Sequence, residues 1–272
     1  MNRIKQRFES LRQQGRKALV SYVVMGDPAK DVTLPVMHAL VESGTDIIEL
    51  GIPFSDPNAE GPVIQKAHER ALENGSSLRD ALGKVNQFRE TNSDTPVLLM
   101  GYANPIERMG YDHFIEQAVA AGVDAVLTVD LPPEEAEEFN EHLKQANMEN
   151  IFLLAPTSSP SRQKKVTDMA GGFIYYVSLK GVTGAGNLDV NSVNENVTSI
   201  RSLTDLPVCV GFGIKDGASA RAVADLSDGV VVGSVLVNQI AELAEKGETD
   251  PAIYASAISV IITEIRQALD RQ

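Results

Sequence analysis

The sequence predicts an α/β protein of the (β/α)8 or TIM-barrel class, built as a single domain over residues 1–272 with one extra helix at each end of the chain. Eight short apolar runs recur along the chain, and a segment with helical periodicity follows each of them. No Pro/Gly/Ser-rich linker or low-complexity tract divides the sequence. A strict alternation of strand and helix with right-handed crossovers closes most naturally into such a barrel.

The predicted strands are rich in β-branched residues and are bounded by Gly, Asp or Pro. Their apolar character is continuous rather than alternating, which is typical of parallel strands buried on both faces. In chain order they span residues 19–28, 46–51, 96–105, 124–132, 151–158, 172–181, 207–213 and 228–234.

Helical patterns fill the intervals between these strands. Asp130, followed by prolines and acids, marks the start of one of them. The helices span residues 28–43, 64–88 with a break at Gly75, 111–121, 133–147, 161–169, 193–203, 218–226 and 235–246.

The two extra helices lie at the ends of the chain. At the C-terminal end, Asp250 is the expected N-cap and Pro251 the first helical residue. The apolar residues at helical spacing there are Ile253, Ala257, Ile261 and Ile265. Residues 1–17 place Ile4, Phe8 and Leu11 on one helical face and contain no long apolar core, so we expect neither a signal peptide nor a membrane span.

A doubly wound open sheet is the runner-up fold. That fold predicts a GxGxxG turn after the first strand, and residues 23–31, VVMGDPAKD, lack one.

Composition narrows the classes of function. Lys and Arg total 24 against 37 Asp and Glu, a net charge of -13, which argues against a general affinity for nucleic acid or anionic membranes. Cys209 is the single cysteine, so the chain can form no internal disulfide and has no Cys/His cluster with zinc-ligand spacing. Both observations fit a protein of the reducing cytoplasm.

Glycines at the ends of the last two predicted strands indicate a phosphate site. Gly211, Phe212 and Gly213 end the seventh strand, and Gly233 and Ser234 end the eighth. Active sites of these barrels lie at the carboxyl ends of the strands, and phosphates bind there to main-chain N–H groups at a helix start. The alternative is that both motifs merely turn the chain.

Two glutamates, Glu49 and Glu60, are the candidate catalytic acids. Ile47 and Glu49 share one face of the second predicted strand, where desolvation raises the pKa of a carboxyl group and suits it to exchange protons near neutral pH. Glu60 follows in a loop dense in Pro, Asp and Gly. The alternative for Glu49 is a buried ion pair with a nearby Arg or Lys; together with Glu60 and the phosphate site, catalysis is favoured.

The remaining candidates are weaker. The Gly-rich stretch 178–190 is interpreted as a lid, with a plain flexible connection as the alternative. Tyr22, Tyr102 and Tyr175 are interpreted as walls of an aromatic slot or as packing residues, Cys209 as an inert core residue, and Asp56 and Asp130 as caps. The four histidines fall inside predicted helices and are expected to be surface or packing residues: His38, His68, His113 and His142.

Over essentially its whole length the chain resembles the tryptophan synthase alpha subunit family. The motif ELGIPFSDP at 49–57, followed closely by GP, carries most of the specificity. The other motifs occur in order, each after its own predicted strand: GDP at 26–28, YAN at 102–104, AP at 155–156, GVTGA at 181–185, GFGI at 211–214 and GS at 233–234.

The resemblance implies a retro-aldol cleavage of indole-3-glycerol phosphate to indole and D-glyceraldehyde 3-phosphate, without a metal or organic cofactor in this chain. It makes Glu49 the proton shuttle. Glu60 stands where the family typically has an aspartate that contacts the indole N–H, and Asn58 where an apolar residue is more usual, so the reach and polarity of this loop differ from the family pattern.

Further roles follow from the same resemblance. Tyr22, where the family usually has Phe, would enclose the indole together with Met100, Leu127 and Val129. Tyr175, Thr183 and Gly184 would close the site, with Thr183 bonded to Glu60. The phosphate would be held by Gly184, Gly213, Gly233 and Ser234.

The family's partner is a beta subunit that carries pyridoxal phosphate (PLP) and receives indole through a tunnel within an alpha2-beta2 heterotetramer. Residues 53–58 and 178–190 are the expected contact surface. Two other hypotheses stay open. One is a partner-activating module with weak chemistry of its own, and the other is a different phosphate-binding barrel, disfavoured because the lysines nearest the strand ends are Lys180 and Lys215.

Overall fold

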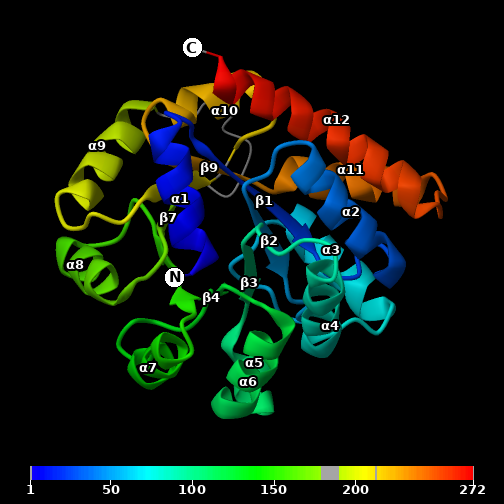
Figure 1. Ribbon diagram of the computed structural model, residues 1–272, viewed down its shortest axis with the longest axis horizontal. Helices are drawn as coiled ribbons and strands as arrows, with labels where there is room; N and C mark the ends of the chain where they lie inside the picture. The colour runs from blue at the N-terminus through cyan, green and yellow to red at the C-terminus, as the bar shows by residue number, and fades with distance from the viewer. Residues whose placement is uncertain (1, 179–189, 212, 272) are drawn as a thin grey trace.

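The computed structural model describes residues 2–178, 190–211 and 213–271. Within these ranges nine strands form one parallel sheet in the order β5-β4-β3-β2-β1-β9-β8-β7-β6, which curls into a barrel (Figure 1). The strands are β1 (Ala18–Val24), β2 (Ile47–Gly51), β3 (Val97–Gly101), β4 (Ala125–Thr128), β5 (Glu149–Asn150), β6 (Phe152–Leu154), β7 (Ile174–Val177), β8 (Val208–Gly211) and β9 (Gly229–Val232).

The two shortest strands, β5 and β6, together occupy one strand position of the barrel. β5 pairs with β4, β6 pairs with β7, and only Ile151 separates them in the chain. The N–H of Ile151 donates to the carbonyl of Val126 on β4 at 2.9 Å, so the ladder continues through the gap. The predicted barrel with eight strand positions is therefore confirmed. Its fifth position, formed by β5 and β6, begins two residues earlier than predicted and ends at Leu154.

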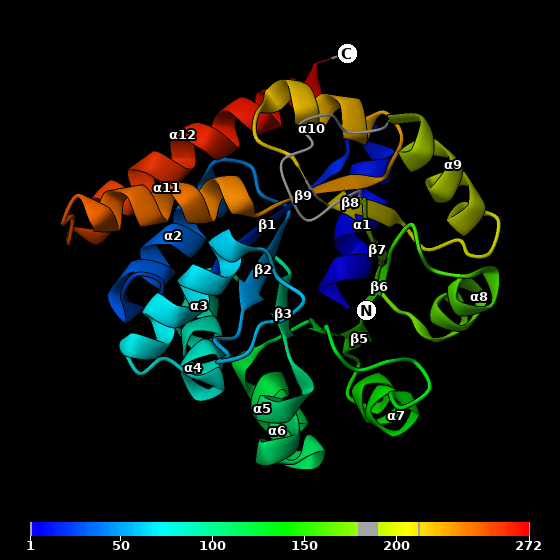
Figure 2. The ribbon, with the colours of Figure 1, turned by 180° about the vertical axis from the view of Figure 1, so that it is seen from behind.

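Helices surround the strands on the outside, as the two opposite views show (Figures 1 and 2). The helices in the described ranges are α1 (Arg3–Gln13), α2 (Lys30–Glu42), α3 (Pro62–Glu73), α4 (Leu78–Arg89), α5 (Ala103–Met109), α6 (Tyr111–Ala121), α7 (Glu137–Gln145), α8 (Pro160–Met169), α9 (Val190–Arg201), α10 (Gly217–Ala224), α11 (Ser234–Glu245) and α12 (Pro251–Asp270). The predicted break at Gly75 is confirmed, because this glycine has a φ of 65° between α3 and α4.

Helix α5 and the start of α7 correct the sequence prediction. Residues 103–105 were expected to end a strand, but the N–H of Ala103 donates to the Asp130 carboxylate at 2.7 Å where α5 begins. Asp130 is thus a cap for α5 and not the N-cap of a helix at 133–147. The observed helix α7 begins at Glu137, with Ala136 as its N-cap.

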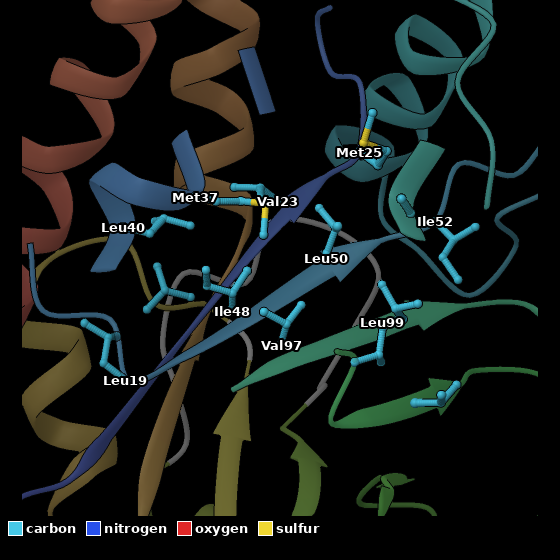
Figure 3. Close-up of a cluster of buried hydrophobic side chains, with 14 of the residues drawn as sticks. Leu19, Val23, Met25, Met37, Leu40, Ile48, Leu50, Ile52, Val97 and Leu99 are labelled. Atoms are coloured by element: carbon cyan, nitrogen blue, oxygen red, sulfur yellow. The ribbon is translucent and has the colours of Figure 1, made fainter. Parts of the chain in front are cut away.

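The core has two layers, separated by the sheet. The outer layer lies between the strands and the helices: Leu19 and Val23 of β1 and Ile48 of β2 point toward Met37 and Leu40 of α2 (Figure 3). The inner layer fills the barrel. It is closed at the amino end by the buried face of α1, formed by Ile4, Phe8 and Leu11 as predicted.

Helix α12 covers α2, α10 and α11 on one side of the barrel (Figure 1). Its N-cap Asp250 and first residue Pro251 are confirmed. Of the predicted apolar stripe, Ile265 is confirmed, while Ile253, Ala257 and Ile261 are each one position off. The buried residues are Tyr254, Ile258, Ile262, Ile265, Arg266 and Leu269. By length and composition α12 is apolar enough to span a membrane, but its buried face packs on the barrel and Arg266 pairs with Asp46 at 3.1 Å.

Candidate active site

The carboxyl ends of β1 and β2 bring the first two site candidates together. Tyr22 and Glu49 are direct partners in the parallel register of these strands. Residues 20, 22, 47 and 49 face the interior, because the alternate residues of each strand belong to the outer core layer. The other residues predicted to enclose the indole or close the site lie on the same side, because the inner cluster includes Met100, Leu127, Val129 and Tyr175.

Glu49 is a buried acid with no compensating partner. Its side chain is 0% exposed, and neither carboxyl oxygen has a hydrogen-bond partner among the described residues. Burial, with a smaller contribution from the charge of Glu60, raises the pKa of Glu49 to about 8. The alternative of a buried ion pair with Arg or Lys has no support within the described residues, so Glu49 carries its proton at neutral pH.

Glu60 lies in the loop between β2 and α3, partly shielded from solvent. Burial raises its pKa to about 7, below that of Glu49, so the two acids differ in their readiness to ionise. The contacts that hold this loop in place involve its other groups and not the Glu60 carboxylate. The ring of Phe54 stacks on Tyr102 with centroids 5.0 Å apart, and the N–H of Ala59 donates to the Tyr102 hydroxyl at 3.2 Å. The side-chain amide of Gln65 donates to the carbonyl of Glu60 at 2.8 Å.

Tyr22 and Tyr175 approach the acids from two sides of the barrel. Burial, followed by the charges of Glu60 and Glu49, raises the pKa of Tyr22 well above its usual value. Burial and the same two acids, Glu49 first, do the same for Tyr175. Both phenols are therefore neutral. Gly211 makes room for Tyr175, because a Cβ at this position would collide with its ring.

The start of α11 is the part of the site suited to an anion. Gly233 is its N-cap and Ser234 its first residue, both at least partly exposed. The N–H of Leu236 bonds to the carbonyl of Gly233 at 2.9 Å, while the helix offers no acceptor to the N–H groups of Ser234 and Val235. A phosphate oxygen suits those donors and the positive end of the helix dipole. Gly233 also lies close to Tyr22, since a Cβ on this glycine would be 3.4 Å from the Cβ of Tyr22.

Other predicted residues divide into those that the structure places and those that it does not. Gly213 is exposed and has a φ of 71°, a conformation that favours glycine. Cys209 is buried in the inner cluster, as predicted. Thr183, Gly184, Phe212 and most of the predicted lid at 178–190 lie outside the described residues.

His68 is buried, in agreement with the packing alternative, but its ring also makes hydrogen-bond contacts that the sequence did not indicate. It is 2% exposed, its Nδ1 accepts the N–H of Phe54 at 3.1 Å, and its Nε2 lies 3.3 Å from the Tyr22 hydroxyl. The signal in the sequence was the helical spacing of Ile64, His68 and Ala71, which form the buried face of α3. Leu153 of β6 was also missed; it packs against the inner cluster beside Tyr175.

Two cavities at the opposite end of the barrel contain none of these candidates. They have volumes of about 630 and 640 Å³ and are lined mainly by α1 and by the loops that enter the strands. Among the described residues, no group of three or more His, Cys, Asp or Glu side chains is placed to hold a metal ion.

Taken with the fold, one buried and one partly buried carboxyl group of raised pKa in a barrel mouth, beside a helix start suited to an anion, indicate an enzyme that works by proton transfer on a small anionic substrate. The family model described as tryptophan synthase alpha chain matches residues 8–262. The chain belongs to the tryptophan synthase alpha chain family.

Individual relatives agree with the family match. The tryptophan synthase alpha chain of Thioalkalivibrio sulfidiphilus is 56% identical over 270 residues, covering 99% of this chain and 100% of the relative. The crystal structure of the alpha subunit from Legionella pneumophila superposes with a TM-score of 0.91 at 44% identity, with 99% of each chain covered. A chain in a tryptophan synthase structure from Mycobacterium tuberculosis gives a TM-score of 0.86 at 33% identity, covering 99% of this chain and 100% of that one.

Proposed function

We propose that this chain, a lyase of the tryptophan synthase alpha family, cleaves indole-3-glycerol phosphate to indole and D-glyceraldehyde 3-phosphate with Glu49 and Glu60 as its working acids. The single observation that carries the assignment of these residues is the unpaired, fully buried carboxyl group of Glu49 beside Glu60. An unpaired buried acid is costly to a fold, so its presence at the carboxyl end of a barrel strand argues for chemistry.

The two pKa values divide the work between the acids. With a pKa of about 8, Glu49 holds a proton at neutral pH and delivers it to C3 of the indole ring. The bond between C3 and the glycerol carbon then breaks, and its electron pair returns to the ring. The Glu49 carboxylate takes the proton from the hydroxyl on that glycerol carbon, which becomes the aldehyde, so the enzyme ends in its starting protonation state.

Glu60 stabilises the charge that the ring acquires. Protonation at C3 places positive charge on the indole ring, and a carboxylate that accepts the ring N–H bond offsets it. Glu60, with a pKa of about 7, is ionised more readily than Glu49. The side chain is one methylene longer than the aspartate usual at this position, so the contacts of the loop with Tyr102 and Gln65 set where the carboxylate reaches.

The rest of the mouth holds the substrate. Tyr22, Met100, Leu127 and Val129 enclose the indole, and Gly213, Gly233 and Ser234 hold the phosphate through main-chain and hydroxyl donors. Thr183 and Gly184 are assigned to closing the site on the family resemblance alone.

The partner is a tryptophan synthase beta subunit in an alpha2-beta2 heterotetramer. In the proposed cleavage the side chains of this chain only transfer protons and stabilise charge, so the proposal places PLP in the partner and not in this chain. The exposed residues Ser55, Asp56 and Asn58 of the loop before α3 are the described part of the contact surface. The single cysteine suits a cytoplasmic location.

The test is the assay of the lone chain on indole-3-glycerol phosphate, with release of indole as the readout. The proposal expects measurable turnover by the chain alone and faster turnover with a beta subunit. The alternative is the partner-activating module, which the residues at positions 60 and 58 motivate. It would be favoured if the lone chain releases no indole from indole-3-glycerol phosphate but activates the beta subunit's own reaction on added indole.

A further inference from the structure

His68 connects two parts of the active site that belong to different elements. It lies on the buried face of α3, and its ring touches β1 through Tyr22 and the loop before α3 through Phe54. The loop that begins at Phe54 continues to Glu60, so one imidazole contacts both a wall of the mouth and the segment that carries an acid.

The hydrogen bonds fix the tautomer of the His68 ring. The main-chain N–H of Phe54 donates to Nδ1, so Nδ1 carries no hydrogen. Burial lowers the pKa of His68 to about 4, which keeps the ring neutral near pH 7. A neutral ring with a bare Nδ1 carries its hydrogen on Nε2, and Nε2 therefore donates to the Tyr22 hydroxyl oxygen, 3.3 Å away. The hydrogen of the Tyr22 hydroxyl is then directed away from His68.

The Tyr22 hydroxyl oxygen lies beside β2, the strand that carries Glu49. It lies over Gly51, because a Cβ at this glycine would collide with the hydroxyl oxygen. Gly51 and Glu49 lie on the same face of β2, two residues apart, and Tyr22 is the register partner of Glu49. The hydroxyl thus stands at the carboxyl end of β2, on the interior side where Glu49 lies.

We propose that His68 is a positioning residue for the aldolase site, which orients Tyr22 so that the hydrogen of its hydroxyl faces the side of the mouth where the two acids lie, while the same ring anchors the start of the Glu60 loop. Among the described residues no hydrogen bond joins Tyr22 to Glu49. The inference rests on the proposed function and adds a donor to it.

A double-mutant cycle tests the pair. His68→Asn keeps an oxygen at the place of Nδ1 for the Phe54 N–H but cannot reach Tyr22, and Tyr22→Phe removes the hydroxyl. Each single change leaves a buried polar group without its partner, so we expect kcat/KM to fall about tenfold in each. The double variant loses both partners together and is expected to fall no further than either single variant. Lys66→Ala, on the exposed face of the same helix, is the control.

Two results of the double-mutant cycle would contradict the proposed role of His68. If the two effects multiply to about 100-fold, the residues act independently and the inference is wrong. If neither single variant changes kcat/KM, the contact has no part in the reaction. Unfolding curves of all four proteins show whether a loss of activity is a loss of folded enzyme.

The pH dependence supplies a readout that packing alone would not move. The titratable groups that act on Tyr22 besides His68 are Glu60, Glu49, Tyr102 and Tyr175. With its hydrogen on the side of the acids, the Tyr22 hydroxyl dipole favours their ionised form. Its loss in Tyr22→Phe is therefore expected to raise the pKa that sets the acidic limb and to move that limb of the kcat/KM profile to higher pH. An unshifted limb would leave His68 a purely structural residue.

The tautomer can be read without any activity. In the unaltered protein, ¹⁵N NMR of the imidazole is expected to show hydrogen on Nε2 and none on Nδ1 at pH 7. Hydrogen on Nδ1 would overturn this inference and leave the proposed reaction intact, whereas an unaltered protein that releases no indole would overturn the proposed reaction and leave the tautomer measurable.

Discussion

Replacing Glu49 by glutamine is expected to lower the rate of indole release and to raise the stability of the fold near neutral pH. The gain in stability follows from the raised pKa of the buried carboxyl group. The pKa of this carboxyl group rises from 4.5 to about 8 on folding, so the folded protein binds the proton more tightly than the unfolded chain does. The free energy of unfolding therefore falls as the pH rises between these values. At ~1.4 kcal/mol per pKa unit, keeping Glu49 protonated in the folded protein, while the same group ionises in the unfolded chain, costs about 3 kcal/mol by pH 7.

Glu49→Gln removes this cost along with the catalytic proton. We expect kcat for indole release to fall by roughly 100- to 10,000-fold, the usual contribution of a general acid–base group. We also expect the variant to gain about 3 kcal/mol of stability relative to the parent at pH 7, compared with their difference at pH 4.5. Comparing the two pH values cancels the burial cost of the neutral amide itself.

The assays are indole release and urea unfolding at both pH values, with Glu42→Gln on the exposed surface of α2 as a control expected to change neither. A stability difference between parent and Glu49→Gln that is the same at pH 4.5 and pH 7 would show that Glu49 ionises normally. Full activity of the variant would remove Glu49 from the mechanism.

Three further predictions concern the acids and the phosphate. Because the acids titrate at about 7 and about 8, kcat/KM of the free enzyme is expected to be bell-shaped with limbs near these values, falling at low pH as Glu60 is protonated and at high pH as Glu49 ionises; a flat profile from pH 6 to 9 would contradict this. Glu60→Asp is expected to retain or raise turnover and Glu60→Ala to lower it by ~100-fold, as steady-state indole release will show; unchanged turnover with Ala would make this acid structural. Ser234→Asp places a negative charge at the start of α11, so KM for the phosphorylated substrate should rise by ~10-fold or more while thermal stability is kept; an unchanged KM would place the phosphate elsewhere.

The sequence predicted the barrel because its signals are local and repeated. Continuous apolar strands, Gly75 with its positive φ and the Asp250–Pro251 helix start each act within a few residues. The errors arise where a residue acts over a long distance. Asp130 has the composition of a helix N-cap for its own segment, yet it accepts the N–H of Ala103, which is 27 residues earlier in the chain.

The candidate site divides in the same way. Glu49 could be found because strand periodicity alone places it on an apolar face, and burial follows from that. His68 could not be assigned, since its partners Tyr22 and Phe54 are 46 and 14 residues away in the chain and meet it only when α3 packs beside β1. Helical spacing could show that His68 is buried, but not which side chains it would contact there.

Acids near the two ends of the barrel differ in whether they have partners, and this bears on the role proposed for Glu49. At the amino end, Asp46, Asp124 and Asp228 each precede a strand and accept an N–H from the first residues of the neighbouring one, at 2.9 Å.

Each of these aspartates also faces an arginine: Asp46 pairs with Arg266 at 3.1 Å, Asp124 with Arg89 at 2.8 Å and Asp228 with Arg201 at 2.9 Å. This fold therefore supplies partners to carboxylates whose role is to join strands and helices. Glu49 lies only three residues after Asp46 and has none of these partners among the described residues. Because an unpaired buried acid costs several kcal/mol, stability does not explain its place at the carboxyl end of β2, and this supports the proton-transfer role proposed for it.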